Sequence, residues 1–167
     1  MVVILGKTVK KWKCIYKVCE ASCCKIPRKL TLSDIKKIAE KTGRAPEDFV
    51  SITKDEDRGI PFVLKRKGDE CIFLGKDYQC ELHNKGVKPL LCQMYPFMLH
   101  KIIYGDEPVM LIKRIPECPG YGEGSTLTEE FLDEIKRQGQ TYVTELRKII
   151  KYRQQGLDPE EIIQKEL

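Results

Sequence analysis

The sequence predicts an α+β fold: a small antiparallel sheet with flanking helices, metal-stapled cysteine loops and a long C-terminal helix. Three observations lead to this fold class. Apolar residues recur at helical spacing near residue 35 and after residue 128, short β-like runs bounded by turn residues lie between residues 51 and 114, and eight cysteines are spread over the chain. The cysteines fall mostly on loops and short elements, where metal would tie the loops together.

Length and composition favour a single domain. At 167 residues the chain is expected to form one domain, 1–167, with a cysteine-cluster region at 14–124 and a helical C-terminal segment at 125–167. A hydrophobic content of 41% and a charged content of 33% exclude a disordered class. No apolar run approaches the roughly 20 residues of a membrane helix. The apolar run Met1–Gly6 follows no basic region, so it predicts a first strand or a buried terminus, and the expected location is the cytoplasm.

The first helix is predicted at residues 32–42 from its capping signals. Thr31 is a candidate N-cap, Asp34 stands three residues later as in a capping box, and Gly43 suits the C-terminal end. One further helical turn is expected at Pro46–Val50, where proline occupies a first helical position. Neither helix carries a chemical motif.

Two pairs of strands are predicted after these helices. Ile60–Leu64 and Cys71–Leu74 are separated by a Lys-Arg-Lys-Gly-Asp turn, so they are expected to pair as a hairpin that delivers a cysteine. Phe97–Tyr104 and Val109–Arg114 flank a second turn. This second pair would lie behind the metal sites.

Prolines and glycines mark the segments that follow. Lys88–Pro96 predicts a short helix entered at Pro89, which would hold Cys92 on a rigid element. Cys118–Gly124 predicts a glycine-rich loop whose N–H groups reach the sulfur atoms of a metal centre. Phosphate or nucleotide binding by these N–H groups is the alternative for this loop.

The chain is expected to end in two helices. An apolar stripe, interrupted by Gly139, predicts a long helix from about Thr128 to Gln155. Gly156 would end this helix, and Asp158 would cap a last short one.

Eight cysteines dominate the chemistry of the sequence. Four lie within eleven positions and four are dispersed, which gives the candidate metal ligands Cys14, Cys19, Cys23, Cys24, Cys71, Cys80, Cys92 and Cys118. Adjacent Cys23 and Cys24 cannot easily form a disulfide, because neighbouring Cα atoms lie ~3.8 Å apart whereas bridged cysteines need ~4.4 to 6.8 Å. In an extended stretch their side chains point to opposite sides, so they could serve two different metal centres. Two groups of four suit two four-thiolate sites for zinc or iron–sulfur clusters, and which cysteines share a centre stays open.

Two alternatives to this metal assignment remain. A single Asn84 beside abundant Lys, Glu and Ile is typical of heat-adapted proteins, in which intracellular disulfides occur. His83 follows Cys80 at a Cys-x2-His spacing that zinc sites use, although a lone histidine is more often a surface or hydrogen-bonded residue. No serine–histidine–acid set, paired-carboxylate motif or phosphate-binding loop is visible, so no catalytic residue is assigned.

Positive charge is concentrated around the first cysteines. Residues 1–30 carry eight basic side chains and one acidic side chain, a net charge of +7, whereas the rest of the chain has 22 basic and 24 acidic side chains, a net charge of −2. Such cations stabilise thiolates. The alternative is a nucleic-acid footprint, in which Trp12 and Tyr16 would stack on bases.

Together these residues resemble a family of cysteine-cluster proteins that is described as a zinc- or iron-chelating domain and includes the flagellin lysine N-methylases. The family's first motif is written CxxxCxxCC, and the gaps here, four and three residues, are each one longer. Lys88 stands where the family typically has arginine. The resemblance covers most of residues 14 to 124 and is carried by the Cys23–Cys24 step, Thr31–Ile35, Cys71–Leu74, Cys80, Lys88–Phe97 and Cys118–Gly120.

The resemblance implies a cytoplasmic domain whose metal ligands are cysteines. The leading hypothesis is a metal-binding protein with one or two cysteine-ligated centres, an iron–sulfur cluster (4Fe–4S) being favoured over zinc. Its role would be electron transfer, redox sensing or assistance to an enzyme, with a protein partner and no membrane partner. Through its methylase members, the resemblance also implies iron–sulfur-dependent protein lysine methylation as an alternative, so whether the chain is an enzyme stays open. A structural zinc protein that binds nucleic acid is the third hypothesis.

Overall fold

The computed structural model describes residues 1–5, 9–54 and 59–167. Gly6 of the apolar N-terminal run and Lys7 of the basic segment lie outside the described residues. The fold is α+β, as predicted, with small sheets, short helices and one long helix near the C-terminus. Among the described residues, no helix combines the length and the apolar character needed to cross a membrane.

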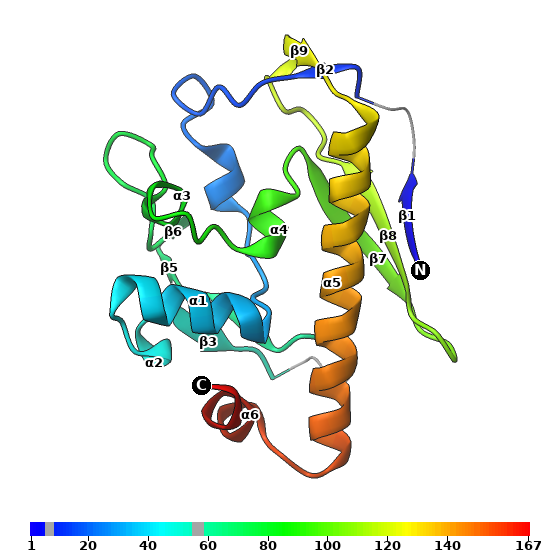
Figure 1. Ribbon diagram of the computed structural model, residues 1–167. Coiled ribbons are helices and arrows are strands. Elements are labelled where there is room, and N and C mark those ends of the chain that lie inside the picture. Colours follow the sequence, from blue (N-terminus) through cyan, green and yellow to red (C-terminus); the bar gives the residue numbers. More distant parts are fainter. Residues whose placement is uncertain (6–8, 55–58) are drawn as a thin grey trace.

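The long helix α5 (Glu129–Gln154) organises the fold. It packs against a three-stranded sheet in the order β1 (Val2–Leu5), β8 (Val109–Arg114), β7 (Phe97–Ile103). Figure 1 shows this sheet on one side of α5 and the shorter helices on the other. The predicted antiparallel pair is therefore present as β7 and β8, and the apolar N-terminal run adds β1 as a strand parallel to β8.

Gly139 lets α5 lie close to the sheet. A Cβ atom at this position would stand 2.8 Å from Val2 Cγ1 and 3.1 Å from Ile112 Cδ1, which is closer than carbon atoms pack in a protein interior. The glycine that interrupts the predicted apolar stripe is thus a point of close contact between helix and sheet. Ile135 and Leu146, on the same face of α5, are buried in the core.

Three two-stranded sheets complete the β structure of the described residues. β3 (Val50–Ile52) pairs with β4 (Phe62–Leu64), and β5 (Arg66–Lys67) pairs with β6 (Glu70–Cys71). The predicted hairpin that delivers Cys71 is present, but it is formed by β5 and β6, so the predicted pairing of the two apolar runs with each other is wrong. The tight turn pairs only the residues directly beside it. Strand β4 pairs with β3 instead, and its residues Phe62 and Leu64 are buried in the core.

The third small sheet joins distant parts of the chain. β2 (Lys11–Trp12) pairs with β9 (Tyr121–Thr126) in antiparallel orientation. The segment predicted as a glycine-rich loop is therefore largely a strand. Gly120 permits the pairing, because a Cβ atom there would stand 2.2 Å from the backbone oxygen of Lys13.

Helix α1 (Leu32–Thr42) has the predicted capping box between Thr31 and Asp34. Its first turn also makes tertiary contacts, since Leu32 N and Ser33 Oγ donate to the carboxylate of Glu145 on α5 at 3.1 and 2.6 Å. These hydrogen bonds fix the start of α1 against the long helix.

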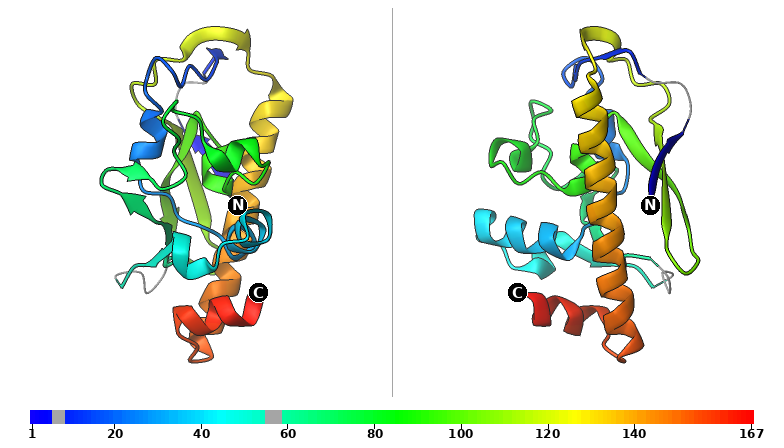
Figure 2. Two further views of the ribbon diagram at one scale, coloured as in Figure 1. Left: turned by 90° about the vertical axis from the view of Figure 1, so that its left-hand side faces the viewer. Right: turned by 45° about the vertical axis from the view of Figure 1, so that its right-hand side comes forward.

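The remaining helices are short. They are η1 (Ser22–Lys25), α2 (Pro46–Phe49), α3 (Glu81–Asn84), α4 (Leu90–Gln93) and α6 (Pro159–Glu166). Asp158 caps α6, as predicted. Figure 2 shows α1 and α6 projecting from the same side of α5, and the two helices contact each other.

Candidate metal centre

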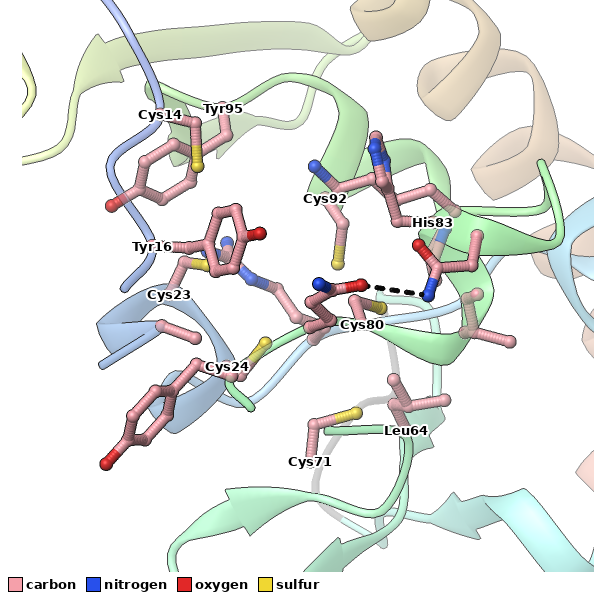
Figure 3. Close-up of a pocket in the computed structure, with 18 of the residues that line it drawn as sticks. Cys14, Tyr16, Cys23, Cys24, Leu64, Cys71, Cys80, His83, Cys92 and Tyr95 are labelled. Carbon is pink, nitrogen blue, oxygen red and sulfur yellow. Dashed lines mark hydrogen bonds between the residues drawn. The ribbon is translucent and has the colours of Figure 1, made fainter. Parts of the chain in front are cut away.

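A cavity of about 450 Å³ lies between the short elements and is lined by sulfur. Six of the eight predicted ligands contribute to its wall: Cys14, Cys23, Cys24, Cys71, Cys80 and Cys92. Figure 3 shows their side chains entering from several separate segments. The other two predicted ligands, Cys19 and Cys118, are not among the residues that line the cavity. Residues spread over nearly eighty positions of sequence thus converge on one place.

Cys23 and Cys24 lie on the 3₁₀ helix η1. The chain enters η1 through Glu20 and Ala21, both in the left-handed region, with φ angles of 51° and 48°. Such angles are uncommon for residues other than glycine, and they reverse the chain sharply before the two cysteines. The turn directs η1 toward the cavity.

Cys71 and Cys80 are brought together by two successive turns. Cys71 pairs with Arg66 across the β5–β6 hairpin, and its carbonyl oxygen accepts a hydrogen bond from Leu74 N at 3.0 Å. Leu74 in turn forms an antiparallel bridge with Cys80. Cys80 then becomes the residue before α3, which starts at Glu81.

Cys92 lies on α4, the short helix that the prolines predicted. The N–H of Cys92 donates to Pro89 O at 2.9 Å, and Leu90 N donates to the buried carboxylate of Asp34 at 3.0 Å. Asp34 also accepts from Thr31 N at 3.0 Å. One carboxylate therefore caps α1 and holds the start of the helix that carries Cys92.

Cys14 and Cys118 lie just beyond the same end of the β2–β9 sheet. Lys13 N donates to Gly120 O at 3.2 Å, which holds the two cysteine-bearing segments side by side. The hydroxyl of Tyr121 donates to Ile115 O at 2.6 Å and fixes the segment around Cys118 to the end of β8.

Burial controls the protonation of the deeper thiols. It raises the pKa of Cys71 to about 11 and that of Cys92 to about 12, because a thiolate loses hydration in these positions. Both sulfur atoms therefore bind metal only by giving up a proton.

The adjacent cysteines behave as a pair. A hydrogen bond between them lowers the pKa of Cys23 and raises the pKa of Cys24. The positive charges of Lys88 and Arg28 lower the pKa of Cys23 further. Cys23 is thus the more acidic thiol of the pair.

Arg28 is a buried cation in the cavity wall. It is 7% exposed, and its Nε and Nη2 atoms have no hydrogen-bond partner among the described residues. Its position is set by the backbone, since Leu64 N donates to Arg28 O at 2.8 Å. A buried guanidinium is stable only when an anion or several acceptors face it. The orphaned donors therefore fit a cavity that takes an anionic group.

The thiols are spread around the wall of the cavity. A zinc site brings four sulfur atoms to ~2.3 Å from a single ion. In the described part of the chain, no three His, Cys, Asp or Glu side chains lie close enough together to hold one ion. The thiols instead surround a much larger cavity. Its volume, its thiol donors and its buried cation all fit an iron–sulfur cluster held by cysteine thiolates.

Several members of the site were not predicted as such. Arg28 was expected only as one of the basic side chains of residues 1–30, and Tyr95 was not among the candidate ligands. Tyr95 lines the cavity, and its ring lies 5.9 Å from the ring of Trp12. His83 also lines the cavity, from an exposed position on α3. No local signal identifies Arg28 or Tyr95, because their places depend on strand pairings between distant segments. His83 was visible as an alternative ligand through its Cys-x2-His spacing from Cys80.

The fold and the cavity define a cysteine-rich, metal-chelating domain. The chain belongs to the CxxCxxCC family, whose description is "Putative zinc- or iron-chelating domain" and which matches residues 13–119. The resemblance drawn from the sequence is therefore confirmed. The family name corrects the expected form of the first motif: its gaps are two and two residues, not three and two, so the gaps of four and three here are longer by two and by one. Neither the curated proteins nor the solved structures gave a match to the chain.

Proposed function

We propose that the chain is an iron–sulfur protein that holds its metal with cysteine thiolates in this cavity. Its role would be electron transfer, redox sensing or assistance to an enzyme. The observation that carries the proposal is the arrangement of six thiols around a cavity of about 450 Å³ whose wall contains a buried guanidinium with two unpartnered donors, Nε and Nη2 of Arg28. A zinc site does not require a cavity of this size, because its four sulfur ligands surround a single ion.

The chain's own residues would set the properties of the bound cluster. When bound, a cluster of this kind supplies one-electron transfer. Arg28 would donate hydrogen bonds from Nε and Nη2 to the anionic sulfur atoms, and Lys88 would add a second positive charge at the wall. Trp12, Tyr16 and Tyr95 would limit the access of water to the metal. Reduction potentials of iron–sulfur centres respond to such hydrogen bonds and to solvent exposure.

A protein partner is part of the proposal. Cys14 is exposed, so the cluster edge that it would hold lies at the protein surface. Electron transfer to or from a partner requires such an approach. The partner would be recognised at the face formed by Cys14 and the β2–β9 sheet.

Anaerobic purification followed by metal and acid-labile sulfide analysis tests the proposal. We expect a coloured protein that contains iron and sulfide in equal amounts and is bleached by air or by a reductant. The matched control is Ser22→Ala, a change on η1 that leaves all thiols in place. Colourless protein with stoichiometric zinc and no sulfide would show that the centre is a zinc site.

A further inference from the structure

We propose that Cys23 and Cys24 belong to two different four-thiolate centres, one formed by Cys14, Cys19, Cys23 and Cys118 and the other by Cys24, Cys71, Cys80 and Cys92. This inference rests on the proposed function, because it requires that the thiols bind metal. It goes further by assigning every cysteine to a centre. The division differs from the one in sequence order, which would place Cys24 with the first three cysteines.

The second set is carried by η1, by β6, by the residue before α3, and by α4. Strand β6, which bears Cys71, packs against η1, and the bridge between Leu74 and Cys80 holds the next thiol beside it. Figure 3 shows the sulfur atoms of Cys24, Cys71, Cys80 and Cys92 pointing into the same part of the cavity. Their mutual influence agrees with this view. The sulfur atoms of Cys80 and Cys71 lie close enough to Cys92 to interact with it electrostatically.

The first set is carried by the β2–β9 sheet and by Tyr95. The sheet brings the segments of Cys14 and Cys118 together through the Lys13–Gly120 hydrogen bond. Tyr95 lies between these segments, since its ring contacts Trp12 and its side chain forms a hydrogen bond with Cys118.

The remaining two members of the first set lie within reach of Cys14. Cys23 and Cys19 both lie close enough to Cys14 to interact with it electrostatically. Cys19 is held in place by the turn before η1, where its sulfur contacts Tyr16 O at 3.9 Å. All four thiols therefore lie on or beside the loop that connects β2 to η1 and the strand that pairs with β2.

The geometry of η1 explains why neighbouring cysteines separate. A 3₁₀ helix has three residues per turn, so consecutive side chains leave its axis about 120° apart. Cys23 and Cys24 therefore face different walls while their sulfur atoms remain close enough for a hydrogen bond. Two centres divided in this way would be immediate neighbours, joined through one peptide bond, which is a short path for electrons.

Metal and sulfide content of paired variants tests the division. The proteins are reconstituted anaerobically with iron and sulfide, and each remaining centre is followed by electron paramagnetic resonance. Cys19→Ser/Cys118→Ser should lose half of the iron and half of the sulfide and keep one set of signals. Cys71→Ser/Cys92→Ser should also lose half and keep the other set. A preserved signal shows in each case that the variant is folded.

Single variants of the adjacent cysteines provide the sharpest comparison. Cys23→Ser should weaken the resonance signals of the first centre, which the variant Cys19→Ser/Cys118→Ser removes. Cys24→Ser should weaken the signals of the second centre, which Cys71→Ser/Cys92→Ser removes. The control Ser22→Ala should keep the signals of both centres. Loss of all metal in both paired variants would show one shared centre and overturn the division. Full retention of metal in Cys19→Ser/Cys118→Ser would show that the first centre does not exist.

The experiment tests the assignment of the cysteines to two centres separately from the identity of the metal. If the protein contains zinc without sulfide, the iron–sulfur proposal fails, and the division is then read from zinc, with two ions in the wild type and one in each paired variant. If the wild type binds neither iron nor zinc, both proposals fail.

Discussion

Substitution of Arg28 by methionine should change stability in opposite directions in the metal-free and the metal-loaded protein. Arg28 is 7% exposed, and its Nε and Nη2 donors have no partner among the described residues. An unsatisfied buried donor costs about 1 to 3 kcal/mol, so two of them cost roughly 2 to 6 kcal/mol. Methionine keeps an unbranched, flexible side chain in the same space and removes both donors.

The expected gain in the metal-free protein is smaller than this full cost, because the attraction between Arg28 and the acidic Cys23 thiol is lost as well. We expect Arg28→Met to raise the free energy of unfolding of metal-free protein by about 2 kcal/mol, or the melting temperature by about 4 to 8 °C for a chain of this size. Calorimetry of chelator-treated protein measures this change. The Arg28→Lys variant is the control, since it keeps the charge.

The metal-loaded protein should respond in the other direction. There the guanidinium faces an anionic cluster, and its removal leaves the negative charge without its buried counter-charge. Arg28→Met should therefore lose metal faster to a chelator and have a more negative reduction potential than the wild type, with Arg28→Lys between them. The reasoning is refuted if metal-free Arg28→Met is less stable than the wild type and the loaded variant keeps its metal equally well.

Three further predictions follow from the supports of the site. Asp34→Ala should lower the free energy of unfolding by about 2 to 3 kcal/mol and loosen metal binding, because Leu90 N and the N-terminus of α1 lose their acceptor; denaturant unfolding and chelator competition measure both effects. Gly120→Ala should destabilise the protein by about 1 to 3 kcal/mol, since its Cβ would stand 2.2 Å from Lys13 O; thermal unfolding measures the loss. The metal-free protein should lose stability as the pH rises from 9 toward 12, because burial raises the pKa of Cys92 from 9.0 to about 12 and the folded state keeps the proton that the unfolded state releases; urea unfolding at several pH values measures the slope.

Each of these predictions has a matched control. Gly105→Ala should be nearly neutral, because the nearest atom to its Cβ would be 3.9 Å away. Cys92→Ser should flatten the loss of stability above pH 9. Asp34→Asn should lie between the wild type and Asp34→Ala, since its side chain keeps one acceptor oxygen. Equal slopes for Cys92→Ser and the wild type, or equal stability for Asp34→Ala and the wild type, would contradict the assigned roles.

The local elements were predictable because their signals are local. The Thr31–Asp34 capping box, Gly43 after α1 and the proline before α4 act over three or four residues, and the structure contains each helix that they predict. The eight cysteines were likewise visible as candidate ligands without any structure, since their number and residue type follow from the sequence alone.

Tertiary structure decided what depends on contacts between distant residues. The pairing of β4 with β3 and of β2 with β9 was not predictable, because a strand's apolar pattern does not identify its partner. The burial of Arg28 follows from those pairings, and so does the position of Cys118 beside the first cysteine loop. The sequence alone therefore determined which residues could bind metal. The fold decided which of them face one cavity, because only long-range backbone pairing brings thiols from η1, the β5–β6 hairpin and α4 together.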